Sequence, residues 1–222
     1  MKSFSVAIDG PAGAGKSTVA RQVADRLGLT YVDTGAMYRA VTWKALREQV
    51  NPSDEVAVTR LAQQTQIDIH PTDIWVDGVR VTEEIRSPEV TAQVSAVARI
   101  PGVREALVEK QRAIAQKTGV VMDGRDIGTY VLPDADVKVF LTASIEERAR
   151  RRYLEMMRRG FSANLEELKE AIRRRDEADT TREHAPLRKA DDAVEIDTTS
   201  RSIDDVVERI LELCRTKVGG GE

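Results

Sequence analysis

A glycine-rich stretch from Gly10 to Thr18 constrains the fold of this chain more than any other feature. It reads Gly-Pro-Ala-Gly-Ala-Gly-Lys-Ser-Thr and completes the pattern G-x-x-x-x-G-K-[ST] from Gly10 to Ser17. The apolar run before it, residues 4–9, predicts a buried strand, and apolar residues at helical spacing follow it. Strand, glycine-rich turn and helix form the context in which this pattern predicts a phosphate-binding loop.

The residue types in this loop suit an anionic ligand. Glycines let successive backbone N–H groups face an oxyanion without a Cβ in the way, and the following helix directs its positive end there. Lys16 supplies a cation for the β- and γ-phosphates, and the Ser17 hydroxyl suits Mg²⁺, partly through water. An ordinary glycine-rich turn needs neither the Lys-Ser pair nor three glycines. We expect a nucleoside triphosphate to bind at Gly10, Pro11, Ala12, Gly13, Ala14, Gly15, Lys16, Ser17 and Thr18.

Composition excludes several classes of protein. The 222 residues suffice for one large α/β domain with an insert, and the net charge of −3 argues against a general nucleic-acid binder. Aromatic residues make up only 4%, so no stacking platform for bases is visible. The single cysteine, Cys214, excludes an internal disulfide and multi-cysteine metal motifs. Apolar runs are too short for a membrane span, and the N-terminal residues do not resemble a signal peptide. We therefore expect a cytoplasmic protein without nucleic-acid or membrane partners.

The alternation of strands and helices along the chain predicts a parallel sheet covered on both faces. Further strands are expected at residues 29–32, 119–123, 137–141 and 193–197. Between residues 67 and 86 the pattern differs, because Asp77-Gly78 separates two β-rich runs and predicts a hairpin. Ser144 and Glu147 predict a capping box at the start of an arginine-rich helix, which carries Arg148, Arg150, Arg151, Arg152, Arg158 and Arg159 and ends at Gly160.

Three polar clusters are expected beside the phosphate-binding loop, because ligands gather at the carboxyl ends of parallel strands. They are residues 33–39, residues 123–126, and the set Arg175, Asp179 and Arg182, whose spacing places them on one face of a helix if that helix persists. A single arginine is more often a surface charge, but several together suit phosphoryl transfer between two anions, which guanidinium groups hold in line. The arginine-rich helix pair, with Gly160 as a flexible point, would exclude water on closing.

The chain strongly resembles the bacterial cytidylate kinases from residue 6 to about residue 210. The motifs that carry the resemblance are residues 8–18, 33–39, 101–104, 123–129 and 182–187. It implies a P-loop NTPase-type parallel sheet flanked by helices, an α/β fold, with a small NMP-binding insert containing the β-hairpin and an arginine-rich helical lid. The implied division is core at 1–51, 100–143 and 183–218, insert at 52–99, lid and following helix at 144–182, and a disordered tail at 219–222.

The resemblance also implies an activity and its residues. The γ-phosphoryl group of ATP would pass to CMP or dCMP with Mg²⁺ as cofactor, in a monomer, with Lys16, Arg125 and Arg182 as catalytic residues. The implied CMP contacts are Arg39, Arg125 and Arg182 for the phosphate, Ser95, Arg104 and Asp126 for cytosine, Arg175 and Asp179 for ribose and phosphate, and Asp33, Thr34 and Tyr38 around the nucleotide; the implied lid contacts to ATP are Arg151 and Arg152. Thr34 stands where a serine is frequent in the family, and we expect its hydroxyl to take the place of the serine hydroxyl. The carboxylate of Asp126 would accept a hydrogen bond from the N4 amino group of cytosine and repel the O4 carbonyl of uracil.

Two other kinds of function also use a phosphate-binding loop of this type. A related P-loop small-molecule kinase could act on another nucleotide or on a hydroxyl substrate such as shikimate, but it would want a base near Asp33 and fewer arginines. A regulatory GTPase would need the guanine-reading motif N-K-x-D. The two asparagines, Asn51 and Asn164, are not followed by lysine, which argues against that class.

Overall fold

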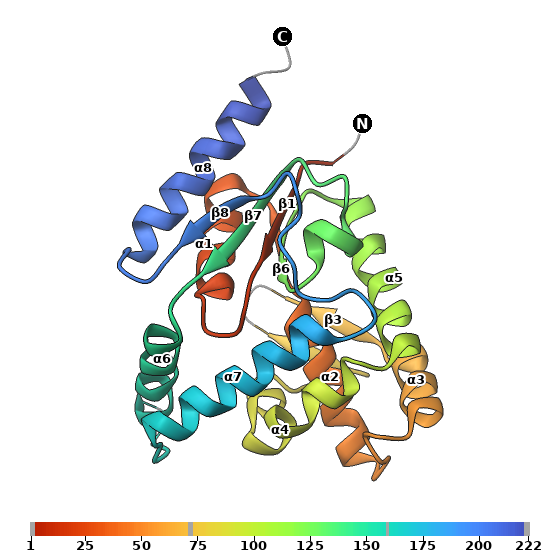
Figure 1. Ribbon diagram of the computed structural model, residues 1–222. Coiled ribbons are helices and arrows are strands. Elements are labelled where there is room, and N and C mark those ends of the chain that lie inside the picture. The colour runs from red at the N-terminus through yellow and green to blue at the C-terminus, as the bar shows by residue number, and fades with distance from the viewer. Residues whose placement is uncertain (1–2, 71–72, 159, 220–222) are drawn as a thin grey trace.

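Five parallel strands form the central sheet in the order β2-β6-β1-β7-β8 (Figure 1). The computed structural model describes residues 3–70, 73–158 and 160–219. The strands are β1 (Ser5–Asp9), β2 (Thr30–Asp33), β6 (Val120–Gly124), β7 (Val137–Thr142) and β8 (Val194–Asp197). All five residues of β1 and of β6 are buried, as is typical of parallel strands covered on both faces. The predicted parallel α/β sheet is confirmed.

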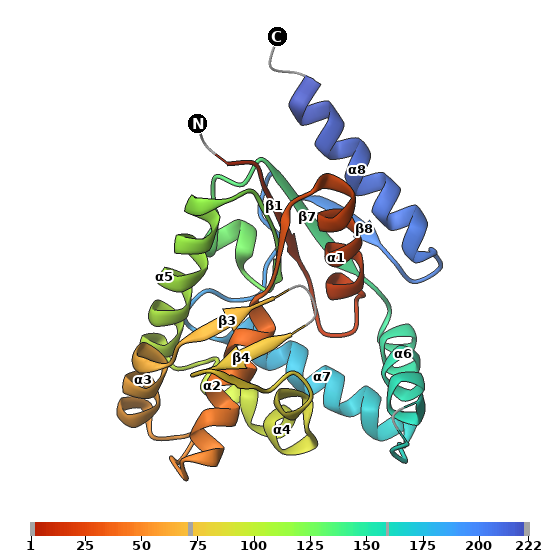
Figure 2. The ribbon, with the colours of Figure 1, turned by 180° about the vertical axis from the view of Figure 1, so that it is seen from behind.

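Helices cover both faces of this sheet. The helical segments are α1 (Lys16–Leu27), α2 (Thr34–Arg47), α3 (Glu55–Gln64), η1 (Glu84–Arg86), α4 (Pro88–Val97), α5 (Pro101–Lys117), η2 (Ile127–Val131), α6 (Ile145–Arg158), α7 (Leu165–Thr181) and α8 (Ile203–Gly219). Apolar residues of α1 and α8 form one core with the sheet, including Cys214, and those of α2, α3, α4 and α5 form the other. Figure 2 shows α1 and α8 together on the face turned away from the viewer in Figure 1.

A small antiparallel sheet lies in the region expected to be the insert. Its strands are β3 (Ile67–Ile69), β4 (Ile74–Val76) and β5 (Val79–Arg80). Val76 pairs with Val79 across Asp77 and Gly78, whose φ angles of 49° and 79° give the primed turn that suits a two-residue hairpin. The hairpin is therefore confirmed, and β3 extends it to three strands. Its apolar face packs on α2.

Two local features differ from the sequence prediction at the lid. Ser144 Oγ accepts the Glu147 N–H (3.2 Å), but the Glu147 carboxylate binds arginines of α6, and the Ser144 N–H donates to Thr199 Oγ1 instead. Only half of the predicted capping box is therefore formed. Helix α7 ends at Thr181, so Arg182 lies just beyond the helix with an extended backbone, and its Nε donates to Ala185 O (2.7 Å).

Two further differences lie elsewhere in the chain. Residues 127–131 form the π-helical turn η2, which the sequence pattern did not predict. Gly219 is the last residue of α8, and the rest of the expected tail, 220–222, lies outside the described residues, as does Arg159.

The chain that follows β1 packs closely against β7 at the carboxyl end of the sheet. A Cβ on Gly10, where φ is 147°, would lie 2.1 Å from Leu141 O on β7, so this position requires glycine. Beyond it, a Cβ on Gly13 would lie 3.1 Å from the Arg148 Cβ on α6. Helices α6 and α7 pack on each other at this end of the sheet, below it in Figure 1. Within the described ranges, no helix combines the length and the apolar character that crossing a membrane requires.

Candidate active site

The glycine-rich loop connects β1 to α1 and places Lys16 in a buried position. Gly15 caps α1 with φ of 88°, and Lys16 Nζ donates to Pro11 O at 2.8 Å. Burial and, next, the nearby Arg125 lower the pKa of Lys16 to about 7, against the attraction of Asp123. A buried cation with a depressed pKa favours an anionic ligand, which would raise that pKa again.

Ser17 and Asp123 form the next part of the site. Ser17 Oγ donates to Asp123 Oδ2 at 2.9 Å, and Tyr31 donates its hydroxyl to Asp123 Oδ1 at 2.8 Å. Thr34 Oγ1 donates to the Asp123 carbonyl oxygen at 2.7 Å. Burial and, next, repulsion from Asp33 raise the pKa of Asp123 to about 6. The sequence placed Asp123 beside the loop but gave it no role, although an acid that ends a buried strand was the signal for one.

Four arginines lie close enough to Lys16 or to one another for their charges to interact. Burial lowers the pKa of Arg39 to about 10, and repulsion from Arg175 is the next cause, with Arg152 contributing. Burial likewise lowers the pKa of Arg175 to about 10, with repulsion from Arg125 next. The Arg175 Nε is buried and has no hydrogen-bond partner in the part of the chain that the structure describes. This group of cations, Lys16, Arg39, Arg125, Arg152 and Arg175, is named the cationic cluster.

Some members of the cationic cluster are held in place by neighbouring acceptors. Arg125 Nε donates to Asp179 Oδ2 at 2.8 Å. Burial alone would raise the pKa of Asp179, but the charge and hydrogen bond of Arg125 hold this pKa below its usual value. Arg39 donates from one terminal nitrogen to Thr91 Oγ1 (2.8 Å) and Ile85 O (3.3 Å). The cluster therefore joins the loop lysine to arginines from α2, α6, α7 and the end of β6.

A second group lies around Asp126. Its carboxylate forms ion pairs with Arg104 and, at 3.4 Å, with Arg182, and the three side chains are only 3–6% exposed. The Arg104 guanidinium lies 5.5 Å from the centre of the Tyr38 ring, and burial raises the pKa of Tyr38 to about 12. The structure thus places Arg182, expected at the acceptor phosphate, beside the residues expected to read the base. Ser95, the remaining residue expected there, lies half-buried on α4.

The other predicted residues fall into different surroundings. Asp33 caps α2 by accepting the Ala36 N–H (2.8 Å), and its second oxygen pairs with Arg86 at 3.1 Å. Arg86 was not predicted, and no local pattern in the sequence marked it. Arg152 pairs with Glu155 at 2.8 Å, whereas Arg151 turns toward the backbone of the glycine-rich loop.

Asp9, which the sequence did not single out, connects the loop to the turn beyond β6. Its two oxygens accept the N–H groups of Ile127 (2.8 Å) and Gly128 (2.7 Å), which hold the start of the π-helical turn η2 in place. Burial raises the pKa of Asp9 to about 6 from its ordinary value of 3.8. A residue directly before the glycine-rich loop therefore positions the segment that follows Arg125 and Asp126.

The raised pKa of Asp9 predicts a specific dependence of stability on pH. Between pH 3.8 and about 6 the folded protein retains this proton while the unfolded chain loses it, so the contribution of Asp9 to stability falls as pH rises. In urea unfolding, the free energy of unfolding of wild type should fall relative to that of Asp9→Asn by on the order of 3 kcal/mol from pH 4 to pH 7.

A matched control for this measurement is Asp192→Asn. The exposed Asp192 has a pKa that a hydrogen bond from Lys138 lowers, so its small effect should have the opposite sign. A difference for Asp9→Asn that stays constant over this range of pH would contradict the prediction.

The chain is similar to known proteins in sequence and in fold. The family model described as Cytidylate kinase matches residues 6–216. A cytidylate kinase of Geobacillus kaustophilus is 56% identical over 222 residues, 98% of this chain and 99% of that protein. One of Bacillus velezensis is 54% identical over 220 residues, 97% of this chain and 98% of that protein. Among solved structures, shikimate kinase from Acinetobacter baumannii gives a TM-score of 0.51 at 15% identity, covering 96% of this chain and 94% of that one. That likeness shows the fold alone.

Proposed function

The chain belongs to the cytidylate kinase family, and we propose that it transfers the γ-phosphoryl group of ATP to CMP or dCMP, giving ADP and CDP or dCDP. The observation that carries this proposal is the cationic cluster. Burial lowers the pKa of Lys16, and repulsion from Arg125 and Arg175 contributes, so these arginines lie within electrostatic reach of the lysine of the triphosphate loop. Two phosphorylated nucleotides that must meet end to end need such a concentration of positive charge.

The residues of the cluster divide the work between donor and acceptor. The amides of the loop and Lys16 hold the donor phosphates, while Arg39, Arg125 and Arg175 hold the acceptor phosphate in line with them. Guanidinium groups also stabilise the charge that spreads over the transferring group in the transition state. A phosphate acceptor is already ionised, so the transfer needs no general base. Arg152 is the lid arginine that reaches this cluster and is assigned to the transferring phosphate.

Cytosine is assigned to the group around Asp126. A carboxylate oxygen accepts a hydrogen bond from the N4 amino group, and Arg104 donates to N3 or O2. Asp126 pairs with Arg104 and Arg182 in a buried place, where an unpaired carboxylate would be costly. Uracil presents a carbonyl at position 4, and its oxygen would repel that carboxylate.

The donor set at the loop fits Mg²⁺. Mg²⁺ keeps several waters and binds proteins through one or two carboxylates together with substrate phosphates, and P-loop enzymes use a hydroxyl and a strand-end acid. Ser17 and Asp123, joined at 2.9 Å, supply these groups. Within the described ranges, no group of three or more His, Cys, Asp or Glu side chains is arranged to hold a metal without such help. When bound, the ion neutralises charge on the β- and γ-phosphates.

The alternative of a hydroxyl acceptor is less well supported. Its base was expected near Asp33, but one oxygen of that carboxylate caps α2 and the other pairs with Arg86. The structural likeness to a shikimate kinase carries no information on substrate. The cytoplasmic location and the monomeric state stay predictions from the sequence.

An acceptor assay tests the proposed function. With ATP and Mg²⁺, we expect kcat/KM for CMP or dCMP to exceed that for AMP and UMP by on the order of 10²-fold or more, because a buried carboxylate discriminates between an amino group and a carbonyl. ADP formation in a coupled assay measures this. Equal rates with CMP, UMP and AMP would remove the cytosine assignment, and activity with shikimate but not with nucleotides would favour the alternative.

A further inference from the structure

Four successive carbonyl groups of the glycine-rich loop each accept a hydrogen bond from a side chain. The donors are Lys16 Nζ to Pro11 O (2.8 Å), Arg148 to Ala12 O (3.3 Å), Arg151 to Gly13 O (3.3 Å) and Thr198 Oγ1 to Ala14 O (3.1 Å). Only Lys16 belongs to the loop motif. The other three donors come from α6 and from the residue that follows β8, so distant parts of the chain hold the loop from outside.

These contacts fix the direction of the amides that a phosphate would meet. In a trans peptide the C=O of one residue and the N–H of the next point in opposite directions. Holding the carbonyls of Ala12 and Ala14 therefore orients the N–H groups of Gly13 and Gly15, while the Ala14 N–H also reaches Pro11 O at 3.5 Å. Glycines at 13 and 15 rotate freely in the unfolded chain, so the loop by itself does not select this orientation.

We propose that Arg148, Arg151 and Thr198 are positioning residues, which preset the amides of the triphosphate-binding loop by holding its carbonyls. The inference rests on the proposed function, since it assigns these amides to the phosphates of ATP. It also gives the lid arginines a role other than contact with substrate.

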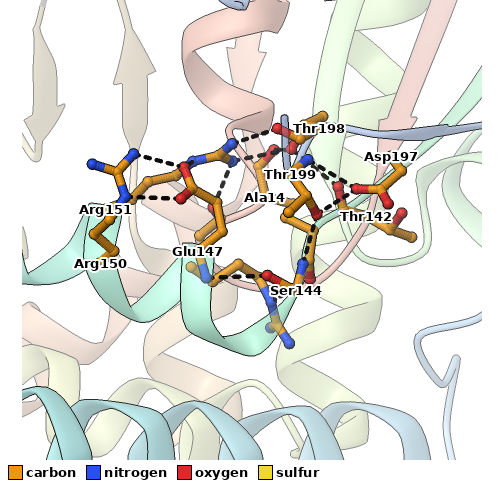
Figure 3. Close-up of polar contacts among 12 residues, drawn as sticks. Ala14, Thr142, Ser144, Glu147, Arg150, Arg151, Asp197, Thr198 and Thr199 are labelled. Atoms are coloured by element: carbon orange, nitrogen blue, oxygen red, sulfur yellow. Dashed lines mark hydrogen bonds and ion pairs between the residues drawn. The ribbon is translucent and has the colours of Figure 1, made fainter. Parts of the chain in front are cut away.

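Thr198 is the centre of this arrangement. It is 4% exposed, and its hydroxyl lies near two carbonyls, Ala14 O at 3.1 Å and Thr142 O at 3.0 Å. The Thr198 N–H already donates to Thr142 O at 2.8 Å, so the single hydroxyl proton is available to Ala14 O. The Thr198 hydroxyl also accepts a hydrogen bond from Arg151 at 3.0 Å, and the Thr198 backbone carbonyl accepts a second one from Arg151 at 2.7 Å (Figure 3).

Arg151 is held from both sides. Its Nε donates to Glu147 Oε1 at 2.8 Å, and Figure 3 shows its guanidinium lying between Glu147 and Thr198. Four of its five N–H groups thus have protein acceptors, counting those to Gly13 O and to Thr198. The adjacent Arg152 instead lies near Arg39 and Arg175. Arg151, expected to bind ATP directly, is therefore assigned to the loop backbone.

Arg148 completes the arrangement. It is buried, donates to Ala143 O at 3.0 Å as well as to Ala12 O, and pairs with Asp176 of α7 at 2.7 Å. Because its removal would leave Asp176 without this partner, Thr198 gives the cleaner test.

The test compares Thr198→Val, which removes the hydroxyl at nearly constant volume, with Thr198→Ser, which keeps it. Steady-state kinetics give kcat and the KM values for ATP and CMP, and calorimetry gives the dissociation constants of MgATP and of inorganic tripolyphosphate, which lacks adenine. For Thr198→Val we expect both dissociation constants and KM for ATP to rise about tenfold, the usual consequence of one lost hydrogen bond at a binding site. KM for CMP should change by less than about twofold, and Thr198→Ser should restore wild-type values.

Thr65→Val is the matched control. Thr65 is likewise buried and its hydroxyl donates to a backbone carbonyl, Leu61 O, at 2.6 Å, but at the C-terminal end of α3. It should leave both KM values unchanged. If Thr198→Val does not fold, as thermal melting would show, Arg151→Met is used instead, since that side chain is 27% exposed and the substitution removes the donors to Gly13 O and Thr198.

The outcomes separate this inference from the proposed function. Unchanged tripolyphosphate and ATP affinities in the folded variant would overturn the inference, as would equal increases of both KM values. If wild type fails to phosphorylate CMP, the proposed function fails, while direct binding of tripolyphosphate still decides whether Thr198 positions the loop.

Discussion

Lys16→Met should lower kcat for phosphoryl transfer to CMP by on the order of 10³-fold, the upper range for loss of one group that stabilises transition-state charge. Methionine keeps the length and the apolar stem of lysine but has no cation for the β- and γ-phosphates. The coupled assay with saturating ATP and CMP measures the change. Lys189→Ala is the control, because Lys189 is a half-exposed lysine that pairs with Glu195, and its loss should leave kcat within about twofold.

Stability provides an independent check on the same variant. The pKa of Lys16 is lowered to about 7 in the folded protein from 10.5. The unfolded chain therefore binds more protons than the folded one between these values, and this lysine opposes folding at neutral pH. The free energy of unfolding of Lys16→Met at pH 7 should equal or exceed that of wild type. A variant that loses both activity and stability would indicate a structural role for Lys16, and a near-normal kcat would remove the loop from the mechanism.

Asp126→Asn should lower kcat/KM for CMP by on the order of 10²- to 10³-fold and reduce the preference for CMP over UMP at least tenfold. The asparagine amide presents an N–H donor to the N4 amino group of cytosine, which is also a donor. The uncharged amide also no longer neutralises Arg104 and Arg182. Because breaking a buried ion pair on one side costs about 3–5 kcal/mol, the free energy of unfolding should also fall by that amount. KM for ATP should stay within about threefold, since the loop is separate from this group.

Asp192→Asn is the control for Asp126→Asn. Asp192 pairs with Lys138 at 2.8 Å, but its side chain is 65% exposed, so its loss should cost less than about 1 kcal/mol and leave selectivity unchanged. Rates should be compared at a temperature at which both variants are folded. Equal losses with CMP and UMP would show that Asp126 acts through the structure and not by reading the base.

Local signals in the sequence account for most of the fold. The strand, glycine-rich turn and helix at Gly10–Ser17 and the hairpin at Asp77-Gly78 were predicted, because each depends on neighbours within a few residues. The half-formed capping box at Ser144 and the turn η2 were not. Both involve partners more than 50 residues away in the chain, Thr199 in one case and Asp9 in the other.

The sequence by itself determined the class of chemistry. Gly10–Ser17 specifies a triphosphate loop, and the arginines after the strands and in the later helices supply the charge for a second anion. The spacing of residues also indicated which strand ends would be neighbours, since parallel strands bring their carboxyl ends to one edge.

Only the tertiary structure decided which of these charged residues face the space beside Lys16 and which face the protein. Arg151 and Arg152 are adjacent and chemically identical in the sequence, yet one binds the carbonyls of the loop and Thr198 and the other lies near Arg39 and Arg175. Likewise, Asp123 meets Ser17 across 106 positions. A helix directs successive side chains about 100° apart, and what lies in each direction depends on packing between distant segments, which no local pattern records.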